Sequence, residues 1–231
     1  STLLTMLNLL ACKTLMTSNI SAASIFRVIE MTQPTLLIDE ADTFLRNNPD
    51  MVGILDAGHR FGGTTIRTEY RGKHAIPTRF KCYSPCAIAA INKRTLSGPL
   101  LDRSIIITMR RKLAAERTAA LRIRTTEAEF QDLKRKCTRF MDDNAEQIAK
   151  MRPAAPIGLS DRAADNWEAM FAIADFVSPD WGHRARNAAL ALYRENEQDD
   201  DDTSMQIQLL LDLRDIFGTK EYMLSQNICN E

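Results

Sequence analysis

Two adjacent carboxylates, Asp39 and Glu40, follow a short apolar run. The run, Thr35–Ile38, comes directly after Pro34 and is typical of a parallel strand that is covered on both faces. Ligands bind at the carboxyl ends of the strands in open α/β sheets. We therefore expect Asp39 to hold Mg²⁺ through water and Glu40 to orient or deprotonate a water that attacks a γ-phosphate. A strand followed by polar helix-capping residues is the alternative, and Ala41-Asp42 favours the hydrolytic interpretation over it.

A site that hydrolyses nucleotides also needs a glycine-rich loop that ends in Gly-Lys-Ser/Thr. The chain contains no such loop, but it opens with Ser1-Thr2 and an apolar stretch that continues to Leu10. This pattern resembles the helix that follows a Gly-Lys. We therefore expect a fragment cut directly after the missing Gly-Lys, in which Ser1 binds Mg²⁺ through its hydroxyl and Ser1 and Thr2 contact the nucleotide. The alternative is an ordinary helix with a Ser/Thr N-cap.

Composition limits the class of protein. The 231 residues can bury one large core or two modest ones, and 45% of them are hydrophobic and 26% charged, as in soluble globular proteins. The 30 Lys and Arg balance the 30 Asp and Glu, so net charge does not indicate a nucleic-acid partner. No apolar run approaches the roughly 18 residues that span a bilayer. Five scattered cysteines are typical of reduced thiols in a cytoplasmic protein, and we expect no membrane partner and no zinc site.

Residues 1–112 alternate between strand and helix patterns, which predicts a parallel α/β sheet. The expected helices are 1–13, 21–31 and 49–60, and the expected core strands are 35–38, 87–92 and 105–109. A hairpin of 64–70 and 75–80 is inserted before the second core strand. From residue 113 onward helical periodicity dominates, with one or two helices over 114–151. Residues 159–162 cap a further helix that carries Trp167, Met170, Phe171 and Ile173, and others are expected near 180–195 and 203–217.

Three features together resemble the AAA+ class of P-loop ATPases: the acidic strand end, a second strand ending in Asn92, and Leu100-Leu101-Asp102-Arg103-Ser104 before a third. Several motifs more closely resemble an uncharacterised domain family found in primase- and helicase-like proteins of phages and mobile elements. The resemblance covers nearly the whole chain, and its motifs are Thr17-Ser18-Asn19-Ile20, Leu36 to Leu45, Ile66-Arg67-Thr68, Asp102-Arg103-Ser104-Ile105 and Asp161-Arg162-Ala163-Ala164-Asp165-Asn166-Trp167.

The resemblance implies a fold and three further site residues. Residues 1–112 would form an AAA+-like ATPase core that lacks its first strand and phosphate loop, and 113–231 a helical lid or C-terminal domain. Asn92 would be the polar sensor that positions the lytic water, or alternatively a turn or cap residue. Arg103 would act as an arginine finger in a neighbouring subunit, or alternatively pair with Asp102 or another acid. Arg162 would be a lid arginine that reaches the γ-phosphate, or else an ordinary surface arginine.

The inserted hairpin carries the candidate DNA-binding residues Arg71, Lys73 and His74, and Tyr70 is placed to stack on a base. A solvated hairpin tip is the alternative. The resemblance thus implies Mg²⁺-dependent ATP hydrolysis coupled to translocation on or unwinding of DNA in replication of a phage or mobile element. A homo-oligomeric ring, expected to be a hexamer, would act on single-stranded DNA. The alternatives are an ATP-driven protein remodeller or loader, and an inactive fragment that serves as an interaction module; this chain by itself is expected to be inactive.

Overall fold

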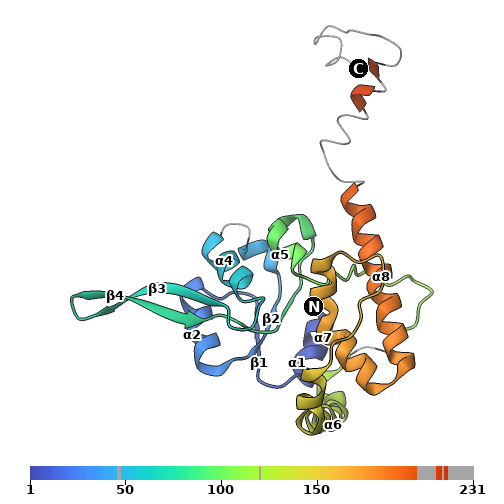
Figure 1. The fold of residues 1–231 in the computed structure, drawn as a ribbon, viewed down its shortest axis with the longest axis horizontal. Helices are drawn as coiled ribbons and strands as arrows, with labels where there is room; N and C mark the ends of the chain where they lie inside the picture. Colours follow the sequence, from blue (N-terminus) through green and yellow to red (C-terminus); the bar gives the residue numbers. More distant parts are fainter. Residues whose placement is uncertain (46–47, 120, 202–211, 215, 218–231) are drawn as a thin grey trace. The chain divides into compact units, whose positions relative to one another are not determined.

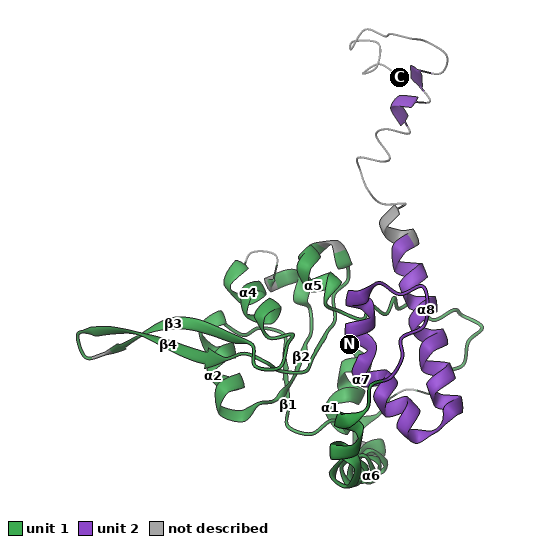
Figure 2. Cartoon of the chain, viewed as in Figure 1, with its two compact units in different colours: residues 1–152 green, residues 153–231 purple. Residues whose placement is uncertain are grey.

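The chain divides into two compact units. The computed structural model describes residues 1–45, 48–119, 121–201, 212–214 and 216–217. The first unit spans Ser1–Arg152 and the second Pro153–Glu231 (Figure 2). The first combines helices with a small parallel sheet and a hairpin, whereas the described part of the second is helical. The expected mixed α/β class with a helical C-terminal part is therefore confirmed at this level.

A three-stranded parallel sheet forms the centre of the first unit. Its strands are β1 (Thr14–Thr17), β2 (Thr35–Ile38) and β5 (Cys86–Ile88), in the order β1-β2-β5 (Figure 1). Leu36 lies opposite Leu15 on one side and Cys86 on the other. The three apolar residues of β2 that follow Thr35 are at most 1% exposed. The predicted strand is therefore confirmed, and it is the central strand of this sheet, covered on both faces.

Helices α2 (Ala22–Thr32) and α4 (Pro49–Ala57) supply most of the remaining core. The side chain of Ser21 caps α2, since its hydroxyl accepts a hydrogen bond from the Ser24 N–H, and Asn48 caps α4 in the same way through the Met51 N–H. The buried side chains of these helices are Ile25, Phe26, Ile29, Met51, Ile54 and Leu55. The other short elements are α1 (Thr2–Leu10), α3 (Ala41–Phe44), η1 (Lys93–Thr95) and α5 (Gly98–Asp102).

Strands β3 (Thr64–Arg71) and β4 (His74–Lys81) form an antiparallel hairpin that projects from the body of the first unit (Figure 1). Gly72 and Lys73 form its two-residue turn, and Gly72 has a φ of 64°, which glycine adopts without steric cost. At the base, the Phe80 ring packs 4.6 Å from the Phe26 ring of α2, measured between centroids. The expected hairpin is confirmed, with each strand one residue longer at the turn.

A single long helix, α6 (Ile123–Lys150), belongs to the first unit. It packs against α1. Cys12 follows the end of α1, and its Sγ lies 3.2 Å from the Oγ1 of Thr138 in α6. The predicted domains meet at 112/113, whereas the compact units meet at 152/153. The difference arises because α6, although helical and charged, packs on the α/β unit.

The strand predictions for 87–92 and 105–109 need correction. The strand β5 covers only Cys86–Ile88, so Asn92 lies four residues beyond its end. Residues 105–109 form no strand in the described part of the chain, because a β-forming run makes a strand only where a neighbour offers its backbone groups. The helix expected at 203–217 lies largely outside the described residues, which show helix at 212–214 and 216–217. No helix among the described residues is long and apolar enough to cross a membrane.

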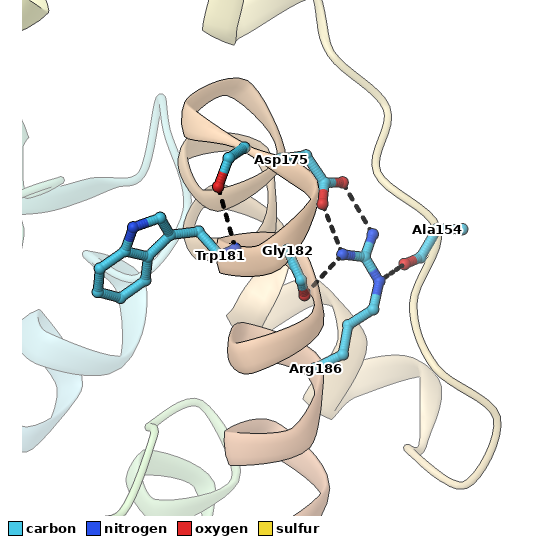
Figure 3. A network of polar contacts seen from close by, with 6 residues as sticks. Ala154, Asp175, Trp181, Gly182 and Arg186 are labelled. Carbon is cyan, nitrogen blue, oxygen red and sulfur yellow. Dashed lines mark hydrogen bonds and ion pairs between the residues drawn. The ribbon is translucent and has the colours of Figure 1, made fainter.

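The second unit is built on α7 (Asp161–Val177) and α8 (Pro179–Asp201), which pack together. Arg186 of α8 connects three segments of the second unit: the stretch that contains Ala154, helix α7 and the start of α8 (Figure 3). Its guanidinium donates to both carboxylate oxygens of Asp175, at 2.6 and 2.8 Å, and to the carbonyl oxygens of Ala154 and Gly182, both at 3.0 Å. A Cβ at Gly182 would lie 2.2 Å from the Asp175 Oδ1, so this arrangement requires a glycine there.

This network predicts an acid-sensitive step in the unfolding of the second unit. The hydrogen bonds from Arg186 lower the pKa of Asp175, so they stabilise the fold above the unfolded-state pKa of about 3.9 and lose that effect as pH falls through the lower folded value. We expect Asp175→Asn to lower the free energy of unfolding by about 1–2 kcal/mol at pH 7, because a quarter of each side chain is exposed.

The test is urea unfolding at pH 7 and at several values below 4, followed by tryptophan fluorescence. Trp167 and Trp181 are the two tryptophans of the chain and both lie in the second unit, so the signal reports that unit. The difference between wild type and Asp175→Asn should shrink as the pH is lowered below about 4. A difference that stays constant over this range would contradict the assignment.

Candidate active site

The carboxyl end of β2 carries the two predicted carboxylates. The Asp39 N–H donates to the Thr17 carbonyl oxygen at 2.9 Å, so Asp39 continues the pairing with β1. Its Oδ1 accepts from the Glu40 N–H at 3.1 Å. The side chain of Asp39 is 22% exposed, and Glu40 is exposed. Asp39 is therefore held by its surroundings, while Glu40 faces solvent.

The structure brings Ser1 to Asp39. The amino group of Ser1 contacts the Asp39 Oδ2, and Ser1 is the N-cap residue of α1, with Thr2 as its first helical residue. The Ser1 hydroxyl makes no capping hydrogen bond in this helix, so the hydrogen bond expected of an ordinary Ser N-cap is not made. The Asp39 carboxylate thus lies at the N-terminus of a nine-residue helix, where negative charge is favoured.

Glu40 has a left-handed backbone, with φ of 53° and ψ of 38°. This conformation costs a residue other than glycine on the order of 1 kcal/mol. Two contacts with the segment after β5 hold the neighbouring residues in place: the Ala41 N–H donates to the Ala89 carbonyl oxygen at 3.0 Å, and the Ile91 N–H donates to the Asp42 Oδ1 at 3.2 Å. The turn thus directs Glu40 away from the buried strand, and its side chain makes no capping bond to α3.

Asn92 follows Ile91 in this same segment, so it lies near the carboxylates in the fold. Its carbonyl oxygen accepts from the N–H and hydroxyl of Thr95, at 3.2 and 2.7 Å, and so starts the short helix η1. These backbone contacts are those of a turn residue, which is the alternative stated above. The sensor role of the Asn92 side chain stays a prediction.

Arg103 has an acidic partner within the chain. Its Nη1 donates to the Asp56 Oδ1 and to the Pro99 carbonyl oxygen, both at 3.2 Å. The partner is Asp56 of α4. An open pocket beside Asp56 is also lined by Val52, Gly53 and Ser97, and Asp39 and Glu40 are not part of its lining. The finger role of Arg103 stays a prediction, and it requires this ion pair to open.

Lys73 and His74 are exposed at the hairpin tip, and Arg71 lies opposite His74 in the register. The side chain of Arg71 lies outside the described part of the structure. Nearer the base, Arg67 pairs with Asp50 of α4 at 3.5 Å. Charges from α2 also hold the base, since Arg27 pairs with Glu69 at 3.8 Å and Glu30 accepts from the Lys81 N–H.

Arg162 lies in the first turn of α7, in the second unit, and is exposed. Its role as a lid arginine stays a prediction. Asp42, Asp50 and Asp56 make contacts that the sequence analysis did not predict. Asp50 and Asp56 bind arginines 17 and 47 residues away, and such distant pairs leave no local spacing pattern that could identify them.

The chemistry of these residues fits Mg²⁺, which is held in proteins by one or two carboxylates together with substrate phosphates and water. Asp39 supplies such a carboxylate, and the hydroxyl of Ser1, the residue whose amino group contacts that carboxylate, is a suitable second oxygen. Among the described residues no group of three or more His, Cys, Asp or Glu side chains gathers as a metal cage. The residues at this site therefore fit Mg²⁺ only if the phosphates of a substrate complete its coordination.

Comparisons with known proteins add a family and one relative. The family model described as "Protein of unknown function (DUF3631)" matches residues 108–231, more than half of the chain. An "Uncharacterized 28.9 kDa protein in xis 5'region" of Saccharopolyspora erythraea is 36% identical over 110 residues, which are 48% of this chain and 41% of the relative. The chain thus spans about two fifths of the length of this curated relative. No solved structure matches the chain significantly.

Proposed function

The chain belongs to the DUF3631 family of proteins of unknown function, and from this premise we propose that it forms part of a P-loop ATPase of the AAA+ class. This ATPase hydrolyses ATP with Mg²⁺ and couples the reaction to movement along single-stranded DNA. The observation that carries the proposal is the packing of α1, which starts after Ser1, against β2, which ends at Asp39. This packing places the backbone nitrogen of Ser1, rather than its hydroxyl, beside the Asp39 carboxylate. These two residues come from separate motifs that were each assigned to the same Mg²⁺, and 38 positions separate them along the chain.

In the proposed reaction, Asp39, through water, and the Ser1 hydroxyl would hold the metal, which would neutralise charge on the phosphates when bound. Glu40 accepts a hydrogen bond from a water and takes its proton as the water oxygen attacks the γ-phosphorus. The bond between the γ-phosphorus and the bridging oxygen breaks, and ADP and phosphate leave. The exposed position of Glu40, at the end of a strand and outside the core, supports this role.

The edges of the sheet also support a P-loop core. Within the described part of the chain, β5 has a strand neighbour only on its β2 side, and the β-forming run Ile105–Met109 has none. A phosphate loop joins a strand to the helix that follows it. The proposal therefore requires a strand and a glycine-rich loop upstream of Ser1. That strand would pair with β5 on one side and with residues 105–109 on the other.

Coupling to DNA is supported by the projecting hairpin. Its tip presents Lys73 and His74 to solvent. Ion pairs attach its base to α2 and α4. Along the chain, α4 comes after α3, and α3 begins directly after Asp39 and Glu40. A change at the carboxylates therefore has a short physical route to the hairpin. The relative is named for the 5′ region of xis, a mobile-element setting in keeping with a role in DNA replication or transfer.

The test is steady-state ATP hydrolysis by a longer protein that includes the residues upstream of Ser1, with and without single-stranded DNA and with Mg²⁺ or EDTA. Hydrolysis that requires Mg²⁺ and rises with DNA is the expected result. Hydrolysis that ignores DNA but rises with a protein substrate would replace the DNA coupling with a protein remodeller. No hydrolysis under any condition would overturn the proposal and leave an inactive interaction module.

A further inference from the structure

One face of the hairpin is left exposed by the described residues of the first unit. Along β3, exposed residues alternate with half-buried ones from Thr64 to Tyr70. Because side chains alternate between the faces of a strand, the exposed residues share one face. The register places exposed residues of β4 on the same face. We call this set the outer face: Thr64, Ile66, Thr68, Tyr70, Ala75, Pro77, Arg79 and Lys81.

The opposite face is occupied by contacts with the body. There Arg67 lies 5.9 Å from the centre of the Phe26 ring and pairs with Asp50, and Phe80 is 8% exposed against α2. The hairpin is therefore fixed by one face and presents the other. Among the described residues of the first unit, no other element covers the outer face.

The outer face is aromatic, apolar and basic. Tyr70 is 76% exposed and Ile66 is 59% exposed. Arg79 lies directly across from Ile66, and Lys81 is the next residue along that face of β4. The face contains no Asp or Glu. Glu30 of α2 accepts a hydrogen bond from the backbone N–H of Lys81, but among the described residues the side chains of Arg79 and Lys81 form no ion pair. It therefore complements an anionic partner that also offers flat apolar surface.

We propose that the outer face binds single-stranded DNA, with Tyr70 stacking on a base and Arg79 and Lys81 contacting phosphates. Every base has a flat face that an aromatic ring accepts, and basic side chains follow the backbone. In a duplex the bases are stacked on one another, so an exposed ring on a flat sheet has nothing to stack on. The inference deepens the proposed coupling to DNA but does not require that the protein hydrolyse ATP.

A second copy of the chain is a poorer occupant. Pro77 has no N–H to offer to another strand at the free edge of β4, which disfavours pairing of hairpins through that edge. Two outer faces packed on each other would also bring Arg79 and Lys81 of both copies together. Like charges would then repel at the contact.

The test is binding of a fluorescently labelled oligo-dT to the 231-residue chain, measured by anisotropy over a range of salt concentrations. We expect Tyr70→Ala to weaken binding about tenfold without changing the salt dependence, and Tyr70→Phe to restore it, because stacking needs the ring and not the hydroxyl. Arg79→Ala should reduce the slope of log affinity against log salt by about 0.7, the loss of one phosphate contact. Arg60→Ala, at an exposed arginine outside the hairpin, is the matched control and should change the slope less.

Several outcomes would overturn the inference. They are no binding of oligo-dT at low salt, equal binding by wild type, Tyr70→Ala and Arg79→Ala, and tighter binding of duplex DNA or of RNA of matched sequence. Circular dichroism checks that each variant is folded. Loss of binding in the variants of a protein that hydrolyses no ATP would uphold the inference while the proposed ATPase fails. DNA-stimulated hydrolysis that is unchanged in Tyr70→Ala and Arg79→Ala would uphold the proposed ATPase and overturn the inference about the outer face.

Discussion

Replacing Glu40 with glutamine will lower the rate of ATP hydrolysis by at least about a hundredfold in a protein that contains the upstream phosphate loop. Glutamine keeps the size of the side chain and can still orient a water, but it cannot take the proton that the attacking water must lose. Glu40 is exposed and makes no capping hydrogen bond, so the substitution should change the free energy of unfolding by less than about 0.5 kcal/mol. The rate loss would then report chemistry rather than folding.

Asp42→Asn is the matched control for Glu40→Gln. This substitution also converts a carboxylate to an amide, two positions after Glu40. The side-chain oxygen of the new asparagine can still accept the hydrogen bond that Asp42 receives from the Ile91 N–H. We expect it to keep most of the activity. Steady-state hydrolysis and ATP affinity should be measured for both variants. If Asp42→Asn is as inactive as Glu40→Gln, the loss comes from the turn and the assignment of Glu40 as the base fails.

The candidate carboxylates could be located from the sequence because the signals around them are local. A continuous apolar run bounded by Pro34 and Asp39 can form a buried strand of four residues and little else, and the structure has it at Thr35–Ile38. The hairpin was predictable for the same reason, since Gly72 and Lys73 interrupt two β-forming runs. Strand β1, at Thr14–Thr17, was not predicted from the sequence, because only four residues mark it.

The remaining features depend on partners that are distant in sequence. Residues 105–109 have the composition of a strand, but composition does not provide a neighbour, and in the described residues they have none. The partner of Arg103 is Asp56, 47 positions earlier, and α6 joins the first unit through contacts with α1. Each of these depends on the final packing of the chain. The resemblance to AAA+ proteins supplied roles for Asn92, Arg103 and Arg162, but it did not supply these contacts.

Arg103→Ala is expected to lower ATP hydrolysis about a thousandfold in the assembled longer protein, which is typical for loss of an arginine finger. The reason is that a neighbouring subunit would lose the guanidinium that stabilises charge on the transferred phosphate. The structure also offers a purely local account, because Arg103 is bound to Asp56 and to the Pro99 carbonyl oxygen. Asp56→Asn separates the two accounts. It removes the charge of the local partner but leaves Arg103 in place, so it should keep hydrolysis within about tenfold of wild type if Arg103 acts on a neighbour's nucleotide.

Mixing two inactive proteins gives the sharper test. In a ring assembled from Arg103→Ala and Glu40→Gln subunits, some sites combine an intact Glu40 with an intact Arg103 from the adjacent subunit. Such sites should hydrolyse ATP, so the mixture should regain activity that neither protein has alone. If Arg103 serves only to hold α5 against α4 through Asp56, each Arg103→Ala subunit is damaged within itself and mixing restores nothing. In that case Arg103→Ala and Asp56→Asn should also lower the free energy of unfolding by similar amounts, about 1 kcal/mol for a partly exposed ion pair. Recovery on mixing, with little change in stability, would place Arg103 at a subunit boundary.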